Sequence, residues 1–499
     1  MWRREPVTTP VVLGVDIGTS STKGVLVDFA GTIVATVVLA HEVTRPNPGW
    51  VEMEGAVWWD EFCAIARQIV SDEFSITAVG VSGMGPCALV TDSASHPLRP
   101  AILYGIDSRA FAQISTLNAA LDADAIFERC GSYLSSQAIG PKLLWIRETE
   151  PETYQAMGRL YMPNSWLAWN LTGRYVLDHH SASQCTPLYD AHSNDWYHPW
   201  VSAIAPGLEL PELVWPSDVV GSVTAEAARQ TGLPAGIPVV GGSIDAWMEA
   251  VSVDAANPGD LMLMYGTTMF LVATTDARTS YPTLWGTVGA FDGTFSLAGG
   301  MATSGAITGW LRELFGSPDF ASLTREASAS GAGARGIAML PYFAGERTPI
   351  MDPRARGTIV GLTVEHTRGD LYRAALEAVA FGVRHNVETM RAAGVAITRI
   401  VAVGGGTQGS VWTQIVSDVT GLQQVIPRIT IGASYGAALL AASSIEPVDI
   451  TRWNPELEVC QPDPCLSALY DQRYALYRGL SEQVSEISHQ LADFQLNPS

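Results

Sequence analysis

Two short runs of glycine and hydroxyl residues have the composition of phosphate-binding turns. They are Asp16-Ile17-Gly18-Thr19-Ser20-Ser21-Thr22-Lys23 and Tyr265-Gly266-Thr267-Thr268, and each follows an apolar run. Each lies between two expected strands, which excludes a strand–loop–helix nucleotide motif. Successive backbone N–H groups at such a hairpin tip can bind phosphate, and the carboxylate of Asp16 can hold hydrated Mg²⁺. Taken singly, each run is equally typical of a polar turn. Together they indicate one phosphate chain held from both sides.

A glycine triplet and one aspartate add to this pattern. Val403-Gly404-Gly405-Gly406-Thr407-Gln408 follows an expected strand, where glycines let the backbone approach a flat ligand such as adenine. A helix-entry turn is the alternative. Asp245 follows Gly241-Gly242-Ser243-Ile244, and its carboxylate can take the proton of a hydroxyl nucleophile during phosphoryl transfer. Its apolar neighbours predict desolvation, which raises basicity. A helix N-cap is the alternative role.

The elements that must position these residues alternate between strands and helices, which predicts an α/β fold. In the first half we expect strands at 11–15, 24–28, 32–39, 76–81, 89–91 and 101–104, and a helix at 56–70. In the second half we expect strands at 260–265, 270–274, 294–298 and 399–403, and helices at 303–315, 366–390, 410–419, 433–442 and 466–494. The turn signal Asn257-Pro258-Gly259 indicates that the halves meet nearby.

Composition narrows the class of protein. The chain has 499 residues, and 29 Lys and Arg against 50 Asp and Glu give a net charge of −21. This charge disfavours nucleic acid and anionic membranes as partners. No apolar run is long enough to span a bilayer. The six cysteines lack the spacing of a metal site, which is typical of free thiols in a reducing cytoplasm.

Two longer motifs resemble one known family. Gly357-Thr-Ile-Val-Gly361-Leu362, followed by Asp370-Leu371-Tyr-Arg-Ala374-Ala375-Leu376-Glu377, is similar to the C-terminal signature of the FGGY family of carbohydrate kinases, in the actin-like ATPase superfamily. Pro341-Tyr342-Phe343-Ala344-Gly345-Glu346-Arg347-Thr348-Pro349 resembles a loop of that family. A second signature around Lys142-Leu-Leu-Trp145-Ile-Arg-Glu148 is met only in part, because Ile139 replaces Pro, Ser or Thr.

The resemblance implies an α/β protein of two actin-like ATPase (ribonuclease H-like) domains with a cleft between them. Residues 1–250 would be the N-terminal, sugar-binding domain. Residues 251–499 would be the C-terminal, nucleotide-binding domain with a closing helix. It also implies ATP and Mg²⁺, with Asp245 as the catalytic base and Asp16 as the residue that orients metal and phosphate. The implied nucleotide contacts are Gly18, Thr19, Ser20, Gly266, Thr267, Thr268, Gly309, Gly405, Gly406 and Gln408. A homodimer is also compatible with the family.

The expected sugar site departs from the family's patterns. Met84-Gly85-Pro86-Cys87 replaces the Gln-Met-His-Gly of xylulose kinases and also lacks the Arg-Glu of glycerol kinases. Tyr104 stands in place of a Trp and can stack on a sugar or pack in the core. Asp107 and Arg109 either bind sugar hydroxyls or pair with each other. Gln137 faces either the polyol or solvent. The candidate substrate-binding residues are Pro86, Cys87, Tyr104, Asp107, Gln137, Asp245 and Trp247.

The run Ile244-Asp245-Ala246-Trp247 is similar to that of ribulose kinases, with Trp in place of His. The bulk of Trp247 favours substrates of five carbons or fewer. We therefore expect a cytoplasmic kinase for a ketopentose of the xylulose type, xylulose being preferred for its frequency within the family. A polyol kinase of the glycerol or erythritol type is the alternative. A non-catalytic nucleotide-binding sensor is less favoured, because no basic DNA-reading helix precedes the first strand.

Overall fold

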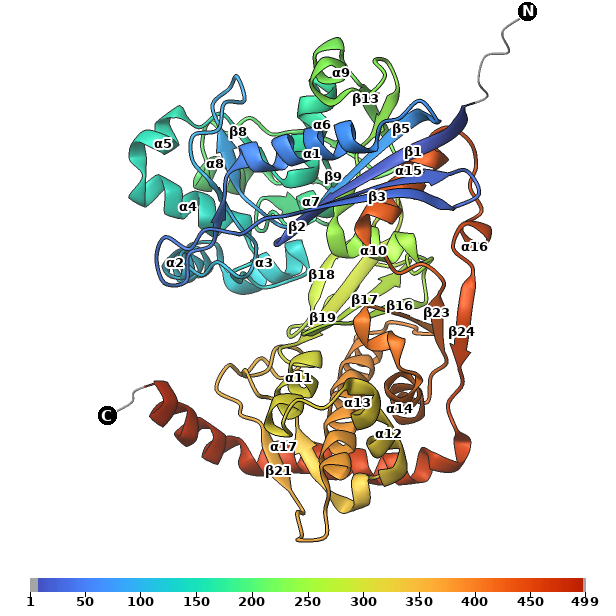
Figure 1. Cartoon of the computed structure of the whole chain (residues 1–499). Helices are drawn as coiled ribbons and strands as arrows, with labels where there is room; N and C mark the ends of the chain where they lie inside the picture. The colour runs from blue at the N-terminus through green and yellow to red at the C-terminus, as the bar shows by residue number, and fades with distance from the viewer. Residues whose placement is uncertain (1–7, 497–499) are drawn as a thin grey trace, which may run out of the picture.

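The polypeptide is organised around two mixed sheets, one from each half of the chain (Figure 1). The computed structural model describes residues 8–496. The first sheet has the order β13 (Val219–Ser222), β14 (Pro238–Val240), β5 (Phe74–Gly83), β1 (Thr9–Ile17), β2 (Ser21–Asp28) and β3 (Ile33–Ala40), with β15 (Ser243–Ile244) also paired to β5. The second has the order β18 (Trp285–Val288), β19 (Phe295–Met301), β17 (Met269–Thr275), β16 (Asp260–Tyr265), β22 (Arg399–Val403), β23 (Gln424–Pro427) and β24 (Glu456–Cys460). The predicted α/β class is confirmed.

Helices cover both sheets and build the outer parts of the two halves. Those of the first half are α1 (Gly55–Ile69), α2 (Phe111–Leu121), α3 (Ala123–Cys130), α4 (Ile139–Thr149), α5 (Pro151–Ala156), α6 (Pro163–Thr172), α7 (His179–Ser183), α8 (His198–Ile204), α9 (Ala225–Thr231) and α10 (Asp245–Ser252). Those of the second are α11 (Gly305–Leu314), α12 (Phe320–Ser330), α13 (Arg368–Ala392), α14 (Ser410–Thr420), α15 (Ala433–Ser443), α16 (Ile450–Trp453) and α17 (Ser467–Leu496).

Short two-stranded ribbons complete the structure. They are β4 (Glu52–Met53) with β7 (Ala101–Ile102), β6 (Leu89–Thr91) with β8 (Arg159–Tyr161), β9 (Val176–Asp178) with β12 (Glu212–Val214), β10 (Tyr189–Asp190) with β11 (Asp195–Trp196), and β20 (Ala338–Leu340) with β21 (Thr358–Val360). Within residues 8–496, every helix is too short or too polar to cross a membrane.

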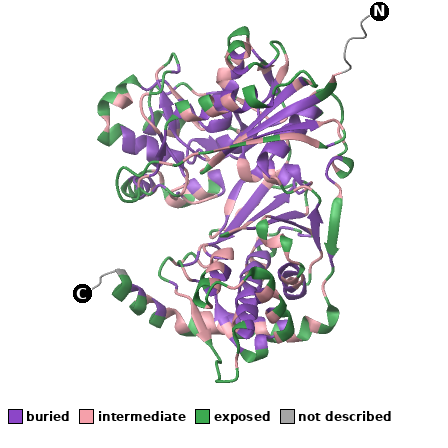
Figure 2. Cartoon of the chain, viewed as in Figure 1, coloured by how far each residue is buried: buried purple, intermediate pink, exposed green. Residues whose placement is uncertain are grey.

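The apolar composition of β1 follows from its position in the sheet. Its central residues are fully buried because the strand lies between β2 and β5 and is covered on both faces. The outer strand β3 alternates between exposed and partly buried residues, as a strand at a sheet edge does. Figure 2 shows the same contrast between buried sheets and the exposed outer surfaces. The hairpin register pairs Asp16 with Lys23 and so places both side chains at one end of the sheet.

Helix α15 comes late in the sequence but packs on the first sheet (Figure 1). Its close approach depends on glycine. A Cβ at Gly14 would lie 2.0 Å from the Ser434 carbonyl oxygen, and one at Gly80 would lie 1.9 Å from that of Ala437. Gly14 and Gly80 are register partners in β1 and β5, so together they form a flat seat for the helix. The division of the chain near residue 250 stays a prediction, and α15 packs across it.

Candidate active site

A cavity of about 390 Å³ is lined by side chains from both halves of the chain. The first half contributes Asp16, Lys23, Tyr104, Gln137, Gln184, Asp245, Trp247 and Glu249. The second half contributes Met264, Thr268, Phe270, Trp285, Thr287 and Arg347, with Ile431 to Ala433 before α15. The cavity therefore brings the predicted base, the predicted metal ligand and one predicted phosphate contact to the same space.

The acidic end of the cavity holds three carboxylates and one lysine. Burial and the charge of Asp16 raise the pKa of Asp245 to about 8. Burial and the same charge raise the pKa of Glu249 to about 7. Burial raises the pKa of Asp16 itself to about 6, although the Ser82 side chain and then the charge of Lys23 oppose the rise. Lys23 Nζ donates to the carbonyl oxygen of Ile431 at 2.8 Å, which ties the first hairpin to the segment before α15.

Asp16 has the chemistry of a metal ligand. Its Oδ1 is buried and has no hydrogen-bond partner within residues 8–496. A buried, unpartnered carboxylate oxygen is costly unless a ligand meets it. Mg²⁺ prefers one or two carboxylates together with water and phosphate oxygens, so a single carboxylate beside a predicted phosphate turn fits that ion.

Both predicted phosphate turns are hairpins closed by backbone hydrogen bonds. In the first, Gly18 N donates to Ser21 O at 3.0 Å, and His41 bonds Gly18 O at 3.0 Å through Nε2. In the second, Gly266 N donates to Thr268 O at 3.1 Å. The second turn also accepts hydrogen bonds from the first backbone amides around α11, which fixes it against that helix. The exposed Thr267 and Thr268 therefore belong to a turn that is hydrogen-bonded to the start of α11.

The expected adenosine contacts lie outside this cavity. Gly405, Gly406 and Gln408 form a short 3₁₀ turn directly after β22. Gly404 before it has φ +91°, and a Cβ there would lie 2.6 Å from Tyr265 O, so the turn requires glycine. An added Cβ at Gly309 in α11 would meet no heavy atom within 4 Å. A nucleotide role for these residues stays a prediction.

Besides Asp245, three predicted sugar contacts line the cavity. Tyr104 shares a hydrogen bond of 2.9 Å with Thr19 Oγ1, which links the sugar side to the first phosphate turn. Gln137 Oε1 accepts from Gly105 N at 2.9 Å, so its carboxamide orientation is fixed. The Trp247 Nε1 donates to Ser296 Oγ at 3.0 Å, and its ring lies 3.8 Å from that of His180. These contacts hold Trp247 rigidly beside Asp245.

Pro86, Cys87 and Asp107 lie behind the cavity wall instead of on it. Cys87 is fully buried, and burial raises the pKa of its thiol to about 12. The carbonyl oxygen of Pro86 accepts from Lys142 Nζ at 3.5 Å. In this loop the residue that lines the cavity is Gly85. The predicted sugar contacts that face the cavity are therefore Tyr104, Gln137, Asp245 and Trp247.

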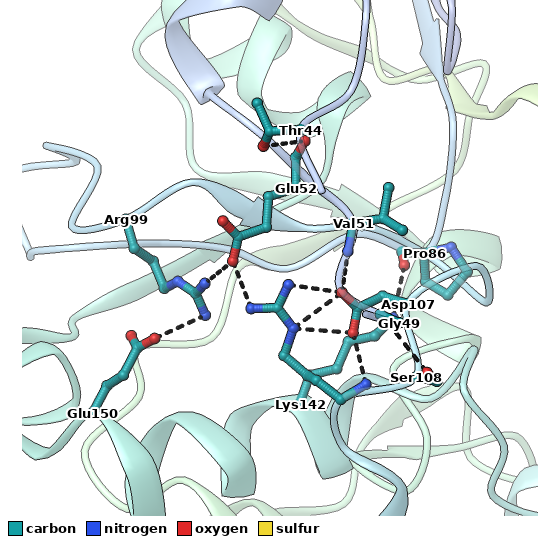
Figure 3. Close-up of polar contacts among 11 residues, drawn as sticks. Thr44, Gly49, Val51, Glu52, Pro86, Arg99, Asp107, Ser108, Lys142 and Glu150 are labelled. Atoms are coloured by element: carbon teal, nitrogen blue, oxygen red, sulfur yellow. Dashed lines mark hydrogen bonds and ion pairs between the residues drawn. The ribbon is translucent and has the colours of Figure 1, made fainter. Parts of the chain in front are cut away.

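Asp107 forms the ion pair with Arg109 that the sequence left as one of two alternatives, while its role as a sugar contact stays a prediction. Its Oδ2 accepts from Arg109 Nη2 at 2.7 Å and from Val51 N at 2.6 Å, while Oδ1 accepts from Arg109 Nε at 3.0 Å. Arg109 Nη1 also pairs with Glu52 at 2.5 Å. Figure 3 shows this closed network, to which Arg99 and Glu150 are joined. The network joins β4 and the loop before it to the segments around α2 and α5.

Several cavity residues were not predicted. Phe270 and Trp285 extend an aromatic wall from Trp247, with ring centroids 6.2 Å and then 6.3 Å apart. The alternation of residues along the strand after the second turn could have indicated Phe270. Glu249 lies one helical turn after Asp245, a spacing that places both on one face of α10. Lys23 ends the first turn motif and Arg347 lies in the loop 341–349, but the sequence alone assigned neither residue a role in the site.

His180 shows how the aromatic wall is anchored. Its Nδ1 lies 2.7 Å from Val288 O, and Gln184 Nε2 lies 2.7 Å from its Nε2. Burial lowers the pKa of His180 to about 3, so the ring is neutral, with Nδ1 donating and Nε2 accepting. The orientation of Gln184 on the cavity wall follows from this bond.

Comparison with known proteins gives a consistent result over most of the chain. The model for the N-terminal domain of the FGGY family of carbohydrate kinases matches residues 11–252, and that for the C-terminal domain matches residues 261–445. A xylulose kinase of Escherichia coli is 29% identical over 95% of this chain and 99% of its own. A glycerol kinase of Rhodopirellula baltica is 29% identical over 90% of this chain and 86% of its own. The crystal structure of a xylulose kinase from Rhodospirillum rubrum has a TM-score of 0.90 and 32% identity, covering 96% of this chain and 100% of that one.

Proposed function

The chain belongs to the FGGY family of carbohydrate kinases, and from that premise we propose that it transfers the γ-phosphate of ATP to a hydroxyl of a ketopentose, xylulose being the first candidate. One observation carries the proposal most strongly. Asp245, Asp16 and Thr268 line the same cavity. A base, a metal ligand and a hydrogen-bond donor to phosphate, drawn from both halves of the chain, can therefore act on one pair of bound substrates.

Asp245 is the proposed base. Its raised pKa makes it a stronger proton acceptor than an ordinary carboxylate once it is ionised. Ala246 N donates to Asp245 Oδ1 at 2.7 Å, which leaves Oδ2 for the acceptor hydroxyl. Trp247 beside it narrows the sugar end and, with Tyr104, offers aromatic faces to a pentose.

Asp16 is the proposed ligand of Mg²⁺. When bound there, the ion would screen the charge of the phosphate oxygens and orient them. Lys23 lies across the hairpin from Asp16 and supplies a fixed positive charge on the same side. The hydroxyl and backbone N–H groups of the two turns would bind the phosphate chain. Closure of the two halves would exclude water and limit ATP hydrolysis.

Release of ADP, measured with Mg²⁺-ATP and a panel of ketopentoses, polyols and hexuloses, tests the proposal. We expect one ketopentose to have the highest kcat/KM. Asp245→Ala should lower kcat by roughly 10²–10⁴-fold, the range of general base catalysis, while calorimetry finds ATP binding unchanged. A polyol as the best substrate would instead indicate a polyol kinase, the activity that the name of the glycerol kinase relative suggests. A hexulose as the best substrate, or full activity of Asp245→Ala, would contradict the proposal. We also propose a cytoplasmic location and a homodimer, the latter testable by sedimentation.

A further inference from the structure

Arg347 is a cation on the cavity wall for which the described part of the chain, residues 8–496, provides no ion pair within 4.0 Å. Its Nη2 donates to the carbonyl oxygen of Met301 at 2.9 Å, and its Nε is buried with no hydrogen-bond partner among residues 8–496. Burial lowers the pKa of Arg347, which reflects the cost of a desolvated charge. An arrangement of this kind is satisfied by an anionic ligand in the cavity.

The acidic residue next to Arg347 in the sequence is already engaged. Glu346 Oε1 accepts from Ala302 N at 2.7 Å and from Arg347 N at 2.8 Å. These bonds hold the Glu346 carboxylate against the backbone that leads into α11. The charge of Glu346 acts on the Arg347 guanidinium, but within residues 8–496 its carboxylate makes no hydrogen bond or ion pair to it, so the guanidinium donors that face the cavity can bind another anion.

The guanidinium is seated close to the second phosphate turn. A Cβ at Gly300 would lie 2.8 Å from Arg347 Nη2, so the absence of a side chain at Gly300 makes room for the guanidinium. The strand register pairs Gly300 with Phe270, which follows Thr268 by two positions. On its other side, the Arg347 Cζ lies 5.8 Å from the centroid of Trp285. The side chain is thus held between the aromatic wall and the Thr268 hairpin, facing the cavity.

We propose that Arg347 donates hydrogen bonds to the nonbridging oxygens of the phosphoryl group while that group is transferred. The proposal rests on the proposed kinase function. In the transfer, the acceptor hydroxyl oxygen forms a bond to the γ-phosphorus, and its proton passes to Asp245. The bond between the γ-phosphorus and the bridging oxygen breaks, and its electron pair leaves with ADP. Arg347 neither forms nor breaks a covalent bond. Its planar fork of donors neutralises oxygens that carry charge throughout the step.

A carboxylate on an acidic sugar is the competing ligand for Arg347. The sugar end argues against it, because Tyr104, Gln137 and Trp247 offer neutral groups there. Arg347 instead lies beside the Thr268 hairpin, where phosphate is expected in every turnover. The observations therefore favour the phosphoryl group.

Two variants and one matched control test this role. They are Arg347→Ala, Arg347→Lys and Arg354→Ala, the last removing an exposed arginine of the same loop that pairs with Asp493 outside the cavity. For each variant, calorimetry compares ADP with a β,γ-imido analogue of ATP in the presence of Mg²⁺. Steady-state kinetics separate kcat from the KM of the best sugar. Melting temperatures show that each variant is folded.

We expect Arg347→Ala to lower kcat by on the order of 10²–10³-fold, the loss typical of one transition-state donor. The sugar KM and ADP affinity should stay close to those of the unmodified enzyme, while the analogue binds more weakly. Arg347→Lys should restore part of kcat, because it keeps the charge but loses the fork. Added guanidinium ion should also restore part of the activity of Arg347→Ala. The control should match the unmodified enzyme.

A higher sugar KM with unchanged kcat in Arg347→Ala would overturn the proposal and assign Arg347 to the sugar. An aldonate as the best acceptor, lost in Arg347→Ala, would overturn it in favour of a carboxylate. Equal weakening of ADP and analogue binding would also overturn it. If no sugar is phosphorylated by the unmodified enzyme, the proposed function fails, and the difference between ADP and analogue binding still decides the role of Arg347. Should Arg347→Ala fail to fold, the same comparisons with Arg347→Lys decide it.

Discussion

Replacing Asp245 with asparagine should stabilise the folded protein at neutral pH while abolishing turnover. The Asp245 pKa rises from 3.8 to about 8 in the folded state because the carboxyl is buried beside Asp16. Between these two values the folded protein holds a proton that the unfolded chain has released. A raised folded pKa gives stability that is fully present below pH 3.8 and is lost as pH rises through about 8. Asparagine carries no such charge, and its Oδ1 can still accept from Ala246 N.

The size of the effect follows from the interval between the two pKa values. Each pH unit within it changes the free energy of unfolding by about 1.36 kcal/mol. The advantage of Asp245→Asn over the unmodified protein is therefore on the order of 2 kcal/mol at pH 5 and 4 kcal/mol at pH 7, and near zero at pH 4. Urea titrations at each pH measure it, and melting temperatures should follow the same trend.

The control is Asp72→Asn, which neutralises an exposed carboxyl far from the cavity in the loop before β5. Its stability relative to the unmodified protein should be nearly independent of pH. If the advantage of Asp245→Asn were the same at pH 5 and pH 7, or became a loss, the carboxyl would not be strained by burial. The explanation of its basicity would then be wrong.

Three further changes test other parts of the structure. Asp16→Asn should remove most of the strengthening of ATP binding by Mg²⁺, measured by calorimetry with and without the metal, and an unchanged metal effect would exclude Asp16 as the ligand. Asp107→Asn should cost about 3–5 kcal/mol of stability in urea titrations, because it weakens a buried ion network; a selective rise in sugar KM would instead make Asp107 a sugar contact. Gly80→Ala should lower the free energy of unfolding by about 1–3 kcal/mol or more, since its Cβ would meet a carbonyl of α15. Gly479→Ala in the open part of α17 should gain up to about 1 kcal/mol in the same assay, and equal effects would refute the packing argument.

The sequence predicted the central strands well because they are buried on both faces. The fully apolar runs of β1 and β16 allow few other structures, and each is followed by a glycine turn that could be recognised locally. The helices α13 and α15 were also predicted near their observed bounds. The strand predicted at 101–104 is shorter, since β7 covers only Ala101–Ile102. By contrast, β18 was missed because its four residues, with Gly and Thr among them, show no clear periodicity.

Parts of the site depend on contacts that local pattern cannot reveal. The Asp107–Arg109 pair was left open because its outcome depends on Glu52, far away in the sequence. Trp285 of the aromatic wall was not predicted because it is the first residue of β18, the strand that the sequence pattern did not indicate. Arg347 faces the cavity only because Gly300 of a neighbouring strand leaves room for it. Contacts between residues far apart in the sequence could not be predicted from the residue spacing within single motifs.

The seat of α15 on Gly14 and Gly80 has a consequence for how the chain is made. A ribosome completes β1 and β5 early, but the helix that covers them begins only at Ala433. During most of synthesis α15 has not yet been made. The face of β1 and β5 that packs against this helix is therefore not covered by it. We therefore expect the emerging first half to need chaperone protection, and native packing of its sheet to follow the synthesis of Ala433–Ser443.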